Sequence, residues 1–306
     1  MAEALVESKV ADSRLVDKKG ASAAELSDAD FERFRDFFYR RTGIYFENSK
    51  RYFVDKRLLE RMRVTGHDNF RSYFATLRFQ ASDDEFQHVV NAMTVNETYF
   101  MREKYQFECL VDEMLDEIVA RNGSKKAIRI WSIPSSTGEE PYSLALMLLE
   151  RWPSIENIDV EIVASDIDTT ALEKAREGIY GDRALQYVSA SMKDRYFKRL
   201  GDGRWQLNRE IREAISFTRL NLADASQTRQ YRDFDVIFCR NLLIYFDDAA
   251  RRRAAQVFFE ALSDGGFICL GHSESMSRIS SSFRVRKFKN ALVYQKPWAD
   301  NGKHTP

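Results

Sequence analysis

The sequence predicts an α/β protein in which a mostly parallel sheet of about seven strands follows an all-helical segment. Residues 128–149 carry the main observation, because a short apolar run, a serine-rich loop and an amphipathic run follow one another as strand, loop and helix. Apolar runs at residues 160–167 and 234–241 are further predicted strands, and each ends in polar residues. Open α/β sheets bind ligands at the carboxyl ends of their strands, so we expect the functional site there.

The composition narrows the classes of function. The chain has 306 residues, and 47 basic side chains balance 47 acidic ones, which gives no overall attraction for nucleic acid. Three cysteines lie far apart, without C-x-x-C spacing or clustered histidines, so we expect reduced thiols and no metal site. Residues 1–25 lack the apolar core of a signal peptide, and no stretch reaches about 18 apolar residues. We therefore expect a soluble, cytoplasmic monomer without membrane insertion.

Residues 26–94 are expected to form a helical domain of four short helices. Ser27 and Asp30 predict a capping box at the start of the first helix, and phenylalanines at helical spacing follow it. Ser82 and Glu85 predict a second capping box at the start of the fourth helix. Short helices of this kind pack as a small bundle.

The second helix, predicted from about residue 48 to 66, has one basic face. The side chains expected on its buried side are Tyr52, Phe53, Leu58, Leu59 and Met62. Its basic residues are Lys50, Arg51, Lys56, Arg57, Arg61 and Arg63. A solvated surface explains such a face as well as a docking site for an acidic protein partner does.

A linker and a helix, residues 95–127, are expected between the bundle and the first strand. The sequence from residue 91 to 107 interleaves polar and aromatic side chains, which is unusual for a core segment and for an idle linker. This segment is placed to close over a ligand, although simple packing between domains is the alternative. The domain with the main sheet is expected to span residues 128–297.

The loop after the first strand excludes a phosphate-binding fingerprint. It contains only Gly138, and Glu139 and Glu140 stand in the first turn of the next helix, where they would repel a phosphate. S-adenosylmethionine fits better, because it has an adenosine, a sulfonium and an ammonium but no phosphate; helix capping alone is the alternative. Asp166, at the end of the second strand, is expected to bind ribose hydroxyls. Capping of the next helix competes for this role, and Asp168 is equally placed for it.

The remaining segments complete the predicted sheet. A small β insertion is expected at about residues 185–214, with a hairpin whose turn lies near Gly201. The main sheet resumes at residues 216–222, and two runs between residues 282 and 296 can form a closing antiparallel pair. Flexible tails are expected at both ends, at residues 1–25 and 298–306.

Five motifs, in this order along the chain, resemble those of the CheR-type chemotaxis receptor methyltransferases. They are TVNETYFMRE, WSIPSSTGEEPYSLA, ASDIDTTALEKAREGIY, FDVIFCRNLLIYFD and GHSES. The resemblance covers about residues 26–296. It implies a class I S-adenosylmethionine-dependent methyltransferase with a Rossmann-like sheet, an N-terminal helical domain and a small β insertion. The implied reaction esterifies glutamate side chains on the cytoplasmic signalling helices of chemoreceptors, also called methyl-accepting chemotaxis proteins, and leaves S-adenosylhomocysteine.

The resemblance also implies site residues, position by position. The implied cofactor contacts are Asn96, Thr98, Arg102, Glu140, Asp166, Asn221, Leu222, Arg240 and Asn241. Two residues, Arg102 and Tyr245, match the pair that flanks the transferred methyl group. The resemblance further implies that the bundle docks on the receptor, and we assign this docking to residues on the basic face of the second helix, namely Lys50, Lys56, Arg57, Arg61 and Arg63.

The implied chemistry agrees with these residue types. A glutamate carboxylate is already ionised at neutral pH, so methyl transfer to it needs alignment and desolvation rather than a strong base. We therefore reject His272 as a base, since a lone histidine in a loop is usually structural. A nucleic-acid methyltransferase is disfavoured by the balanced charge, and a nicotinamide oxidoreductase by the acidic loop. A non-catalytic receptor-binding module would need degraded motifs, and these are intact.

The insertion departs from part of the family. Members that also grip a short peptide at the receptor's C-terminal tail do so through a longer loop with three glycines. Here the turn is only Leu200-Gly201-Asp202-Gly203-Arg204-Trp205. Because a peptide that adds to a sheet edge needs accessible backbone and room, we predict receptor recognition without a tethering pentapeptide.

Overall fold

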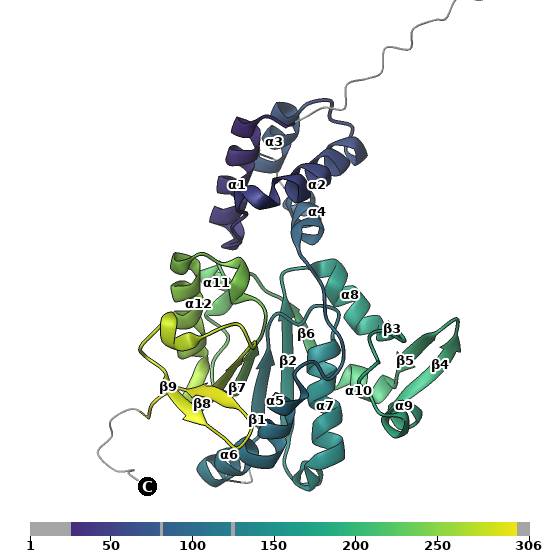
Figure 1. The fold of residues 1–306 in the computed structure, drawn as a ribbon, viewed down its shortest axis with the longest axis vertical. Helices are drawn as coiled ribbons and strands as arrows, with labels where there is room; N and C mark the ends of the chain where they lie inside the picture. Colours follow the sequence, from purple (N-terminus) through teal and green to yellow (C-terminus); the bar gives the residue numbers. More distant parts are fainter. Residues whose placement is uncertain (1–25, 80–81, 124–125, 299–306) are drawn as a thin grey trace, which may run out of the picture.

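The computed structural model describes residues 26–79, 82–123 and 126–298, which form a helical bundle joined to a helix-flanked sheet (Figure 1). The predicted N-terminal tail and all but the first residue of the predicted C-terminal tail lie outside the described residues. Within the described ranges, no helix is long and apolar enough to cross a membrane, and no cluster of His, Cys, Asp or Glu side chains could hold a metal ion.

The bundle contains the predicted helices. They are α1 (Asp28–Thr42), the 3-10 turn η1 (Asn48–Lys50), α2 (Arg51–Val64), α3 (Phe70–Phe79) and α4 (Asp84–Met93). The first capping box is confirmed, because the Ser27 side chain accepts from the Asp30 backbone and the Asp30 carboxylate accepts from the Ser27 backbone. Aromatic rings fill the core of the bundle, where Phe34 and Phe38 are fully buried and stack on each other.

The second predicted capping box is wrong. The helix α4 begins at Asp84, after Ser82, and the Glu85 side chain lies in the core of the bundle. There the Glu85 carboxylate accepts hydrogen bonds from both ends of the Arg61 guanidinium, at 3.0 and 2.6 Å, and from the Tyr73 hydroxyl at 2.7 Å. A bidentate pair of hydrogen bonds between a guanidinium and a carboxylate is stronger than one backbone hydrogen bond at a helix cap, so tertiary partners determine where this carboxylate lies.

The predicted buried side of α2 is wrong at one position. Tyr52 is 79% exposed, and the buried residues of this helix are Val54, Leu58 and Met62. These three positions are four residues apart, which places them on one face of the helix. The aromatic ring of Tyr52 instead stands on the outer surface of the bundle.

A single helical rod connects the bundle to the sheet. Its parts are α5 (Lys104–Cys109), a π-helical turn η2 (Leu110–Met114) and α6 (Leu115–Asn122). It follows a segment without helix or strand that begins at Thr94 and ends in a turn over residues 100–103. The rod packs against α7 and the sheet, and its residues Phe107, Leu110 and Met114 are buried there.

Within the described residues, seven strands form the main sheet, as predicted. In spatial order they are β6 (Ile215–Arg219), β2 (Val160–Asp166), β1 (Ile128–Ser132), β7 (Phe234–Cys239), β8 (Leu262–Leu270), β10 (Leu292–Gln295) and β9 (Arg284–Lys287). The first five strands are parallel, and β10 and β9 form the expected antiparallel pair at the edge. Since β1 lies between β2 and β7, the strand order reverses at β1, where such sheets bind their ligands.

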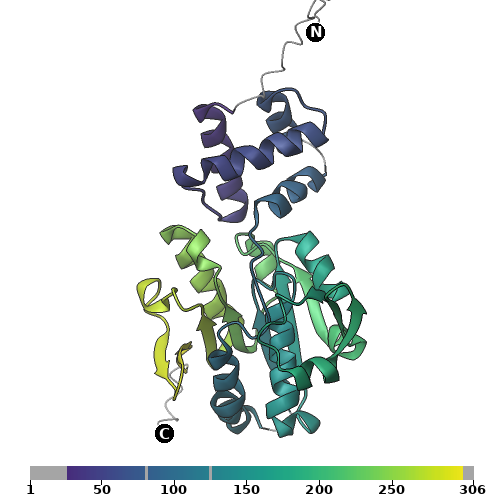
Figure 2. The same cartoon turned by 45° about the vertical axis from the view of Figure 1, so that its right-hand side comes forward.

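Helices cover both faces of this sheet. They are α7 (Glu139–Arg151), the 3-10 turn η3 (Pro153–Glu156), α8 (Thr169–Glu177), α11 (Ala225–Thr228), the 3-10 turn η4 (Leu243–Tyr245), α12 (Asp248–Ala261) and the 3-10 turn η5 (Met276–Arg278). Alternate strand residues point to two separate cores: Ile130 and Phe238 pack with α7 and the rod, and Trp131 and Ile237 pack with α12. The views in Figures 1 and 2 show the bundle standing over one end of the sheet.

A small antiparallel sheet extends from the side of the main domain. Its strands, in spatial order, are β3 (Ile179–Gly181), β5 (Arg204–Leu207) and β4 (Phe197–Gly201), and two short helices accompany it, α9 (Ala190–Tyr196) and α10 (Arg209–Glu213). The predicted hairpin is confirmed, with its turn at Gly201, Asp202 and Gly203. The sequence prediction did not include β3, which lies ahead of residue 185.

Candidate functional site

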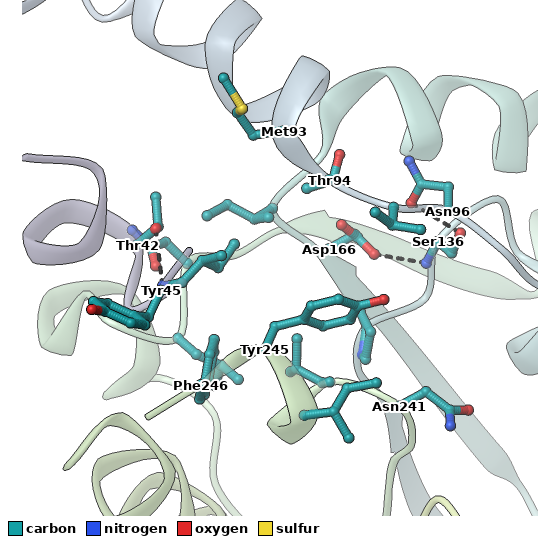
Figure 3. Close-up of a pocket in the computed structure, with 18 of the residues that line it drawn as sticks. Thr42, Tyr45, Met93, Thr94, Asn96, Ser136, Asp166, Asn241, Tyr245 and Phe246 are labelled. Carbon is teal, nitrogen blue, oxygen red and sulfur yellow. Dashed lines mark hydrogen bonds between the residues drawn. The ribbon is translucent and has the colours of Figure 1, made fainter. Parts of the chain in front are cut away.

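A cavity of about 520 Å³ lies between the bundle and the carboxyl ends of β1, β2 and β7 (Figure 3). Its walls come from the loop between α1 and α2, the extended segment after α4, the loops after these three strands and the loop after β6. The predicted site residues that line it are Asn96, Asp166, Asn221, Leu222, Asn241 and Tyr245. Its volume lies in the range of small-molecule sites, about 300–1,000 Å³.

Asp166 occupies the end of β2 and is buried. One carboxylate oxygen accepts from the Ser136 backbone at 2.7 Å, and the other accepts from the Asp168 backbone at 2.9 Å. Burial raises the pKa of Asp166 to about 6, and these two N–H donors oppose the rise. The carboxylate is therefore ionised at pH 7 and faces the cavity with acceptor capacity remaining.

Asp168, not Asp166, caps the helix α8. Its carboxylate accepts from the Ala171 backbone at 3.0 Å, and its other oxygen accepts from Thr94 and Asn96 at 2.6 Å each. The Asn96 side chain also accepts from the Ser136 hydroxyl at 3.1 Å, which joins the linker to the loop after β1. The alternative of a capping role for Asp166 is thereby removed, and Asp166 is left to the cavity.

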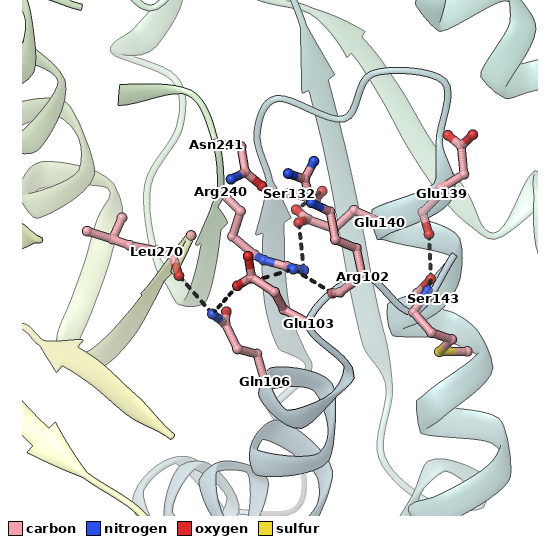
Figure 4. A network of polar contacts seen from close by, with 12 residues as sticks. Arg102, Glu103, Gln106, Ser132, Glu139, Glu140, Ser143, Arg240, Asn241 and Leu270 are labelled. Carbon is pink, nitrogen blue, oxygen red and sulfur yellow. Dashed lines mark hydrogen bonds and ion pairs between the residues drawn. The ribbon is translucent and has the colours of Figure 1, made fainter. Parts of the chain in front are cut away.

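A second group of predicted residues lies beside the cavity, in a buried polar network (Figure 4). The Glu140 carboxylate accepts from the Ser132 hydroxyl at 2.8 Å and pairs with the Arg240 guanidinium at 3.2 Å. Burial raises the pKa of Glu140, and Arg240 and Ser132 counteract it. The neighbouring Glu139 carboxylate points away from Arg240 (Figure 4). It accepts from the Thr137 hydroxyl at 2.6 Å instead, so only one of the two acidic side chains pairs with Arg240.

Arg240 and Arg102 are connected through this network. The buried Arg240 guanidinium stacks on Phe107, lies 3.5 Å from the Glu103 carboxylate and donates to the Arg102 carbonyl oxygen. The Arg102 guanidinium is half-buried and donates to the Glu97 carbonyl oxygen at 3.0 Å. Neither arginine lines the cavity. Thr98 lies on the linker with Arg102, and it does not line the cavity either.

The backbone around the site adopts unusual conformations. Met101 and Glu103, which flank Arg102, have φ of 61° and 53°, and Ser136 and Asn241 have φ of 47° and 58°. Such left-handed conformations are costly for residues other than glycine and persist only where surrounding contacts impose them. Their concentration here indicates that the chain is held in a defined geometry around the cavity.

The bundle contacts the loop that carries Tyr245. Ile44 and Phe246 form an isolated antiparallel bridge, in which the Tyr45 backbone donates to the Tyr245 carbonyl oxygen at 3.2 Å. The Tyr245 ring is 38% exposed and extends across the cavity toward Ser136 (Figure 3). Burial raises its pKa, so its hydroxyl is neutral at pH 7 and available as a hydrogen-bond donor.

The predicted basic face of α2 divides into two parts. Arg61 is committed to the buried Glu85, and Arg57 donates to the Ala92 carbonyl oxygen at 2.6 Å and stacks on a phenylalanine ring. Arg63 pairs with a glutamate in its own helix. Lys50 and Lys56 are exposed, and Lys50 also lines the cavity. The part of the face that can meet a partner is therefore smaller than the sequence suggested.

Comparison with known proteins assigns the family. The model of the CheR methyltransferase SAM binding domain matches residues 96–292, and that of the CheR methyltransferase all-alpha domain matches residues 29–94. The chain belongs to the CheR methyltransferase family. It is therefore an S-adenosylmethionine-dependent methyltransferase, and the predicted fold, enzyme class and cofactor are confirmed.

Named relatives of this CheR family member match most of the chain. Chemotaxis protein methyltransferase 2 of Vibrio cholerae is 56% identical over 272 residues, which cover 89% of this chain and 94% of that protein. The chemotaxis protein methyltransferase of Salmonella typhimurium is 36% identical and covers 85% and 88% of the two chains. The Escherichia coli protein of the same name is also 36% identical, with 85% and 89% covered.

The residues present fit S-adenosylmethionine. Two of the buried polar atoms that have no hydrogen-bond partner within the described residues are Ser135 Oγ, in the loop after β1, and Arg240 Nε, in the network with Glu140. Asp166 offers a carboxylate to hydroxyl groups, and Glu140 is a buried carboxylate that a cationic amine would stabilise. The Asn221 side chain already has a partner in the protein, because it donates to the Arg41 carbonyl oxygen at 2.6 Å.

Sequence reasoning missed two residues that organise the site. Ser136 supplies the N–H that holds Asp166 and the hydroxyl that holds Asn96. Glu103 lies beside Arg240 and accepts from the His272 backbone at 3.3 Å. Both belong to quoted motifs, but their partners lie far along the chain, so no local pattern could assign their roles.

Proposed function

We propose that this enzyme transfers a methyl group from S-adenosylmethionine to glutamate side chains on the cytoplasmic signalling helices of chemoreceptors. The products are glutamyl methyl esters and S-adenosylhomocysteine, and the reaction serves sensory adaptation in chemotaxis or a related pathway. The observation that carries the proposal is the cavity itself, which places the cofactor-side residue Asp166 and the exposed residues Tyr245 and Lys50 around one space. The family and the names of the relatives support it.

The site residues suit this reaction. S-adenosylmethionine supplies an electrophilic methyl group on a sulfonium. The acceptor carboxylate is ionised at neutral pH, so the protein needs to orient it and to exclude water rather than to remove a proton. Tyr245 is a neutral donor that can hold the acceptor by a hydrogen bond, and Arg102, which electrostatically favours ionisation of Tyr245, supplies a positive charge nearby.

We assign the binding of S-adenosylmethionine to the residues that line the cavity and to the buried polar network around Glu140. The residues that line the cavity, with Asp166 at their centre, would hold the adenosine, and Glu140 would receive the ammonium. Arg240 positions Glu140 through their ion pair. Thr98 and Arg102 remain proposed contacts from the linker.

We further assign receptor docking to the exposed lysines of the bundle. Lys50 lies at the cavity and Lys56 lies along α2, and both can attract an acidic helix. Arg63 is exposed but already paired with Glu60, so it contributes less. Docking at this face would bring a receptor glutamate to the mouth of the cavity, in the cytoplasm where those helices lie.

Recognition without a tethering pentapeptide is the remaining part of the proposal. The strand β4 lies at the edge of the small sheet, but the register shifts between Arg199 and Gly201, next to the short turn. The ring of Trp205 lies beside the Arg199 guanidinium and donates to Asp182 at 2.7 Å. A bulged, short strand offers little regular edge for an added peptide. Titration with the isolated C-terminal pentapeptide of a receptor tests this, and a micromolar Kd would refute it.

The decisive experiment uses labelled S-adenosylmethionine and purified cytoplasmic fragments of chemoreceptors. We expect transfer of the label to the fragment in a form that base releases, as glutamyl methyl esters require. A fragment whose methylatable glutamates are replaced by alanine is the matched control and should remain unlabelled. Base-stable label would indicate another acceptor chemistry, and cofactor binding without transfer to any fragment would indicate a binding module.

A further inference from the structure

The GHSES motif contributes a carboxylate that the proposed reaction does not use. Glu274, in the loop after β8, directs both oxygens at backbone N–H groups of its own loop and of the loop after β7. One oxygen accepts from Asn241 at 2.8 Å and from Gly271 at 2.9 Å, and the other accepts from Leu243 at 2.7 Å. A single side chain therefore accepts three backbone hydrogen bonds.

We propose that Glu274 is a positioning residue that fixes the loop after β7 in the conformation needed for methyl transfer; the inference rests on the proposed function. The clamped segment carries Asn241 and leads directly into η4, which ends at Tyr245. Asn241 has φ of 58°, in the left-handed region that asparagine tolerates better than most residues do. The carboxylate bridges Asn241 and Leu243, so both ends of the turn before Tyr245 are held from one point.

The space around the clamp is equally constrained. A Cβ atom added at Gly271 would lie 2.8 Å from a Glu274 carboxylate oxygen and 3.0 Å from the backbone nitrogen of Asn241. Because glycine has no Cβ atom, the Glu274 carboxylate can approach the backbones of both Gly271 and Asn241. The network of Figure 4 also contacts the end of β8, next to Gly271, because Gln106 donates to the Leu270 carbonyl oxygen at 2.8 Å.

Glutamine is the informative substitution at this position. Its side chain keeps the shape but offers only one acceptor oxygen, and its NH₂ group would face an N–H donor. In Glu274→Gln, either Leu243 or the pair of Asn241 and Gly271 loses its acceptor. Hydrogen exchange of the backbone amides, followed by mass spectrometry on peptides that span residues 239–246, measures this directly. We expect exchange to accelerate about tenfold or more, since bonds to a charged acceptor are strong.

The activity readout separates positioning from general stability. Glu274→Gln should lower kcat about tenfold and leave the KM for receptor within about threefold, because the docking face is untouched. In a Tyr245→Phe background, the same substitution should lower kcat by less than about threefold further, since it acts through that loop. Gly271→Ala should disturb the same amides. Glu260→Gln, which changes a surface carboxylate on α12, is the control and should change neither exchange nor kcat.

Two outcomes overturn the inference. Unchanged exchange at residues 239–246 in Glu274→Gln would show that the carboxylate does not hold the loop. Equal losses of kcat in both backgrounds would show that Glu274 acts by a route other than Tyr245. The exchange measurement does not depend on the acceptor, so a wild-type protein that keeps these amides protected but methylates no receptor fragment would refute the proposed function and leave the clamp standing.

Discussion

Cofactor affinity should depend on pH through Asp166. The pKa of this buried carboxyl is about 6, compared with an ordinary value near 3.8. Above pH 6 the group is a carboxylate, which accepts hydrogen bonds from ribose hydroxyls better than the protonated form does. Affinity should therefore be full at pH 7–8 and fall as the pH drops through 6. If only the ionised form binds, Kd rises about tenfold between pH 7 and pH 5.

Calorimetric titration with S-adenosylhomocysteine at pH 5, 6, 7 and 8 measures this dependence. Asp166→Asn should bind about tenfold to a hundredfold more weakly at pH 8, for a loss of about 1–3 kcal/mol, and should lose the pH dependence that Asp166 causes. Glu140 also has a raised pKa, so Glu140→Gln is the control that must keep the slope of the wild type near pH 6. A wild-type Kd that is constant from pH 5 to 7 would refute the assignment of Asp166 to the ribose.

Three further predictions concern the acceptor side and the bundle. Tyr245→Phe should lower the methylation rate on the order of 100-fold and keep cofactor affinity within a few-fold, and full turnover would make Tyr245 a packing residue. Lys50→Glu with Lys56→Glu should raise the receptor KM and flatten its salt dependence, whereas Lys287→Glu at the far sheet edge should not; kinetics equal to wild type at low salt would leave these lysines as solvated surface. Arg61→Ala should destabilise the bundle by about 3–5 kcal/mol in urea unfolding, because Glu85 stays buried without its cation, while Arg63→Ala should cost under about 1 kcal/mol; equal losses would contradict this.

The parts of the structure that the sequence predicted are those set by near neighbours along the chain. The capping box of Ser27 and Asp30 needs only three residues of spacing, and the apolar run at β7 is long enough to require burial on both faces. Each of these features is complete within a few residues.

Several of the failures share a physical cause, which is that a side chain binds partners distant in sequence. Glu85 has the spacing of a capping residue, but Arg61 lies 24 residues away and binds its carboxylate in the core. Because Arg61 is paired with Glu85, its guanidinium is not available on the basic outer face that helical periodicity predicted. Glu274 is the clearest case in the site, since the amide of Asn241 that it accepts from lies 33 residues earlier. No local pattern reveals such a contact.

The bundle is part of the site as well as a candidate docking module. Its loop between α1 and α2 supplies one wall of the cavity, and the bridge from Ile44 to Phe246 ties it to the residue after Tyr245. Asn221 joins the same two parts through the Arg41 carbonyl oxygen. A displacement of the bundle would therefore move the wall of the cavity and the Tyr245 loop together. Under the proposed function, a receptor helix seated on the bundle meets a catalytic loop that is held from one side by the bundle and from the other by Glu274.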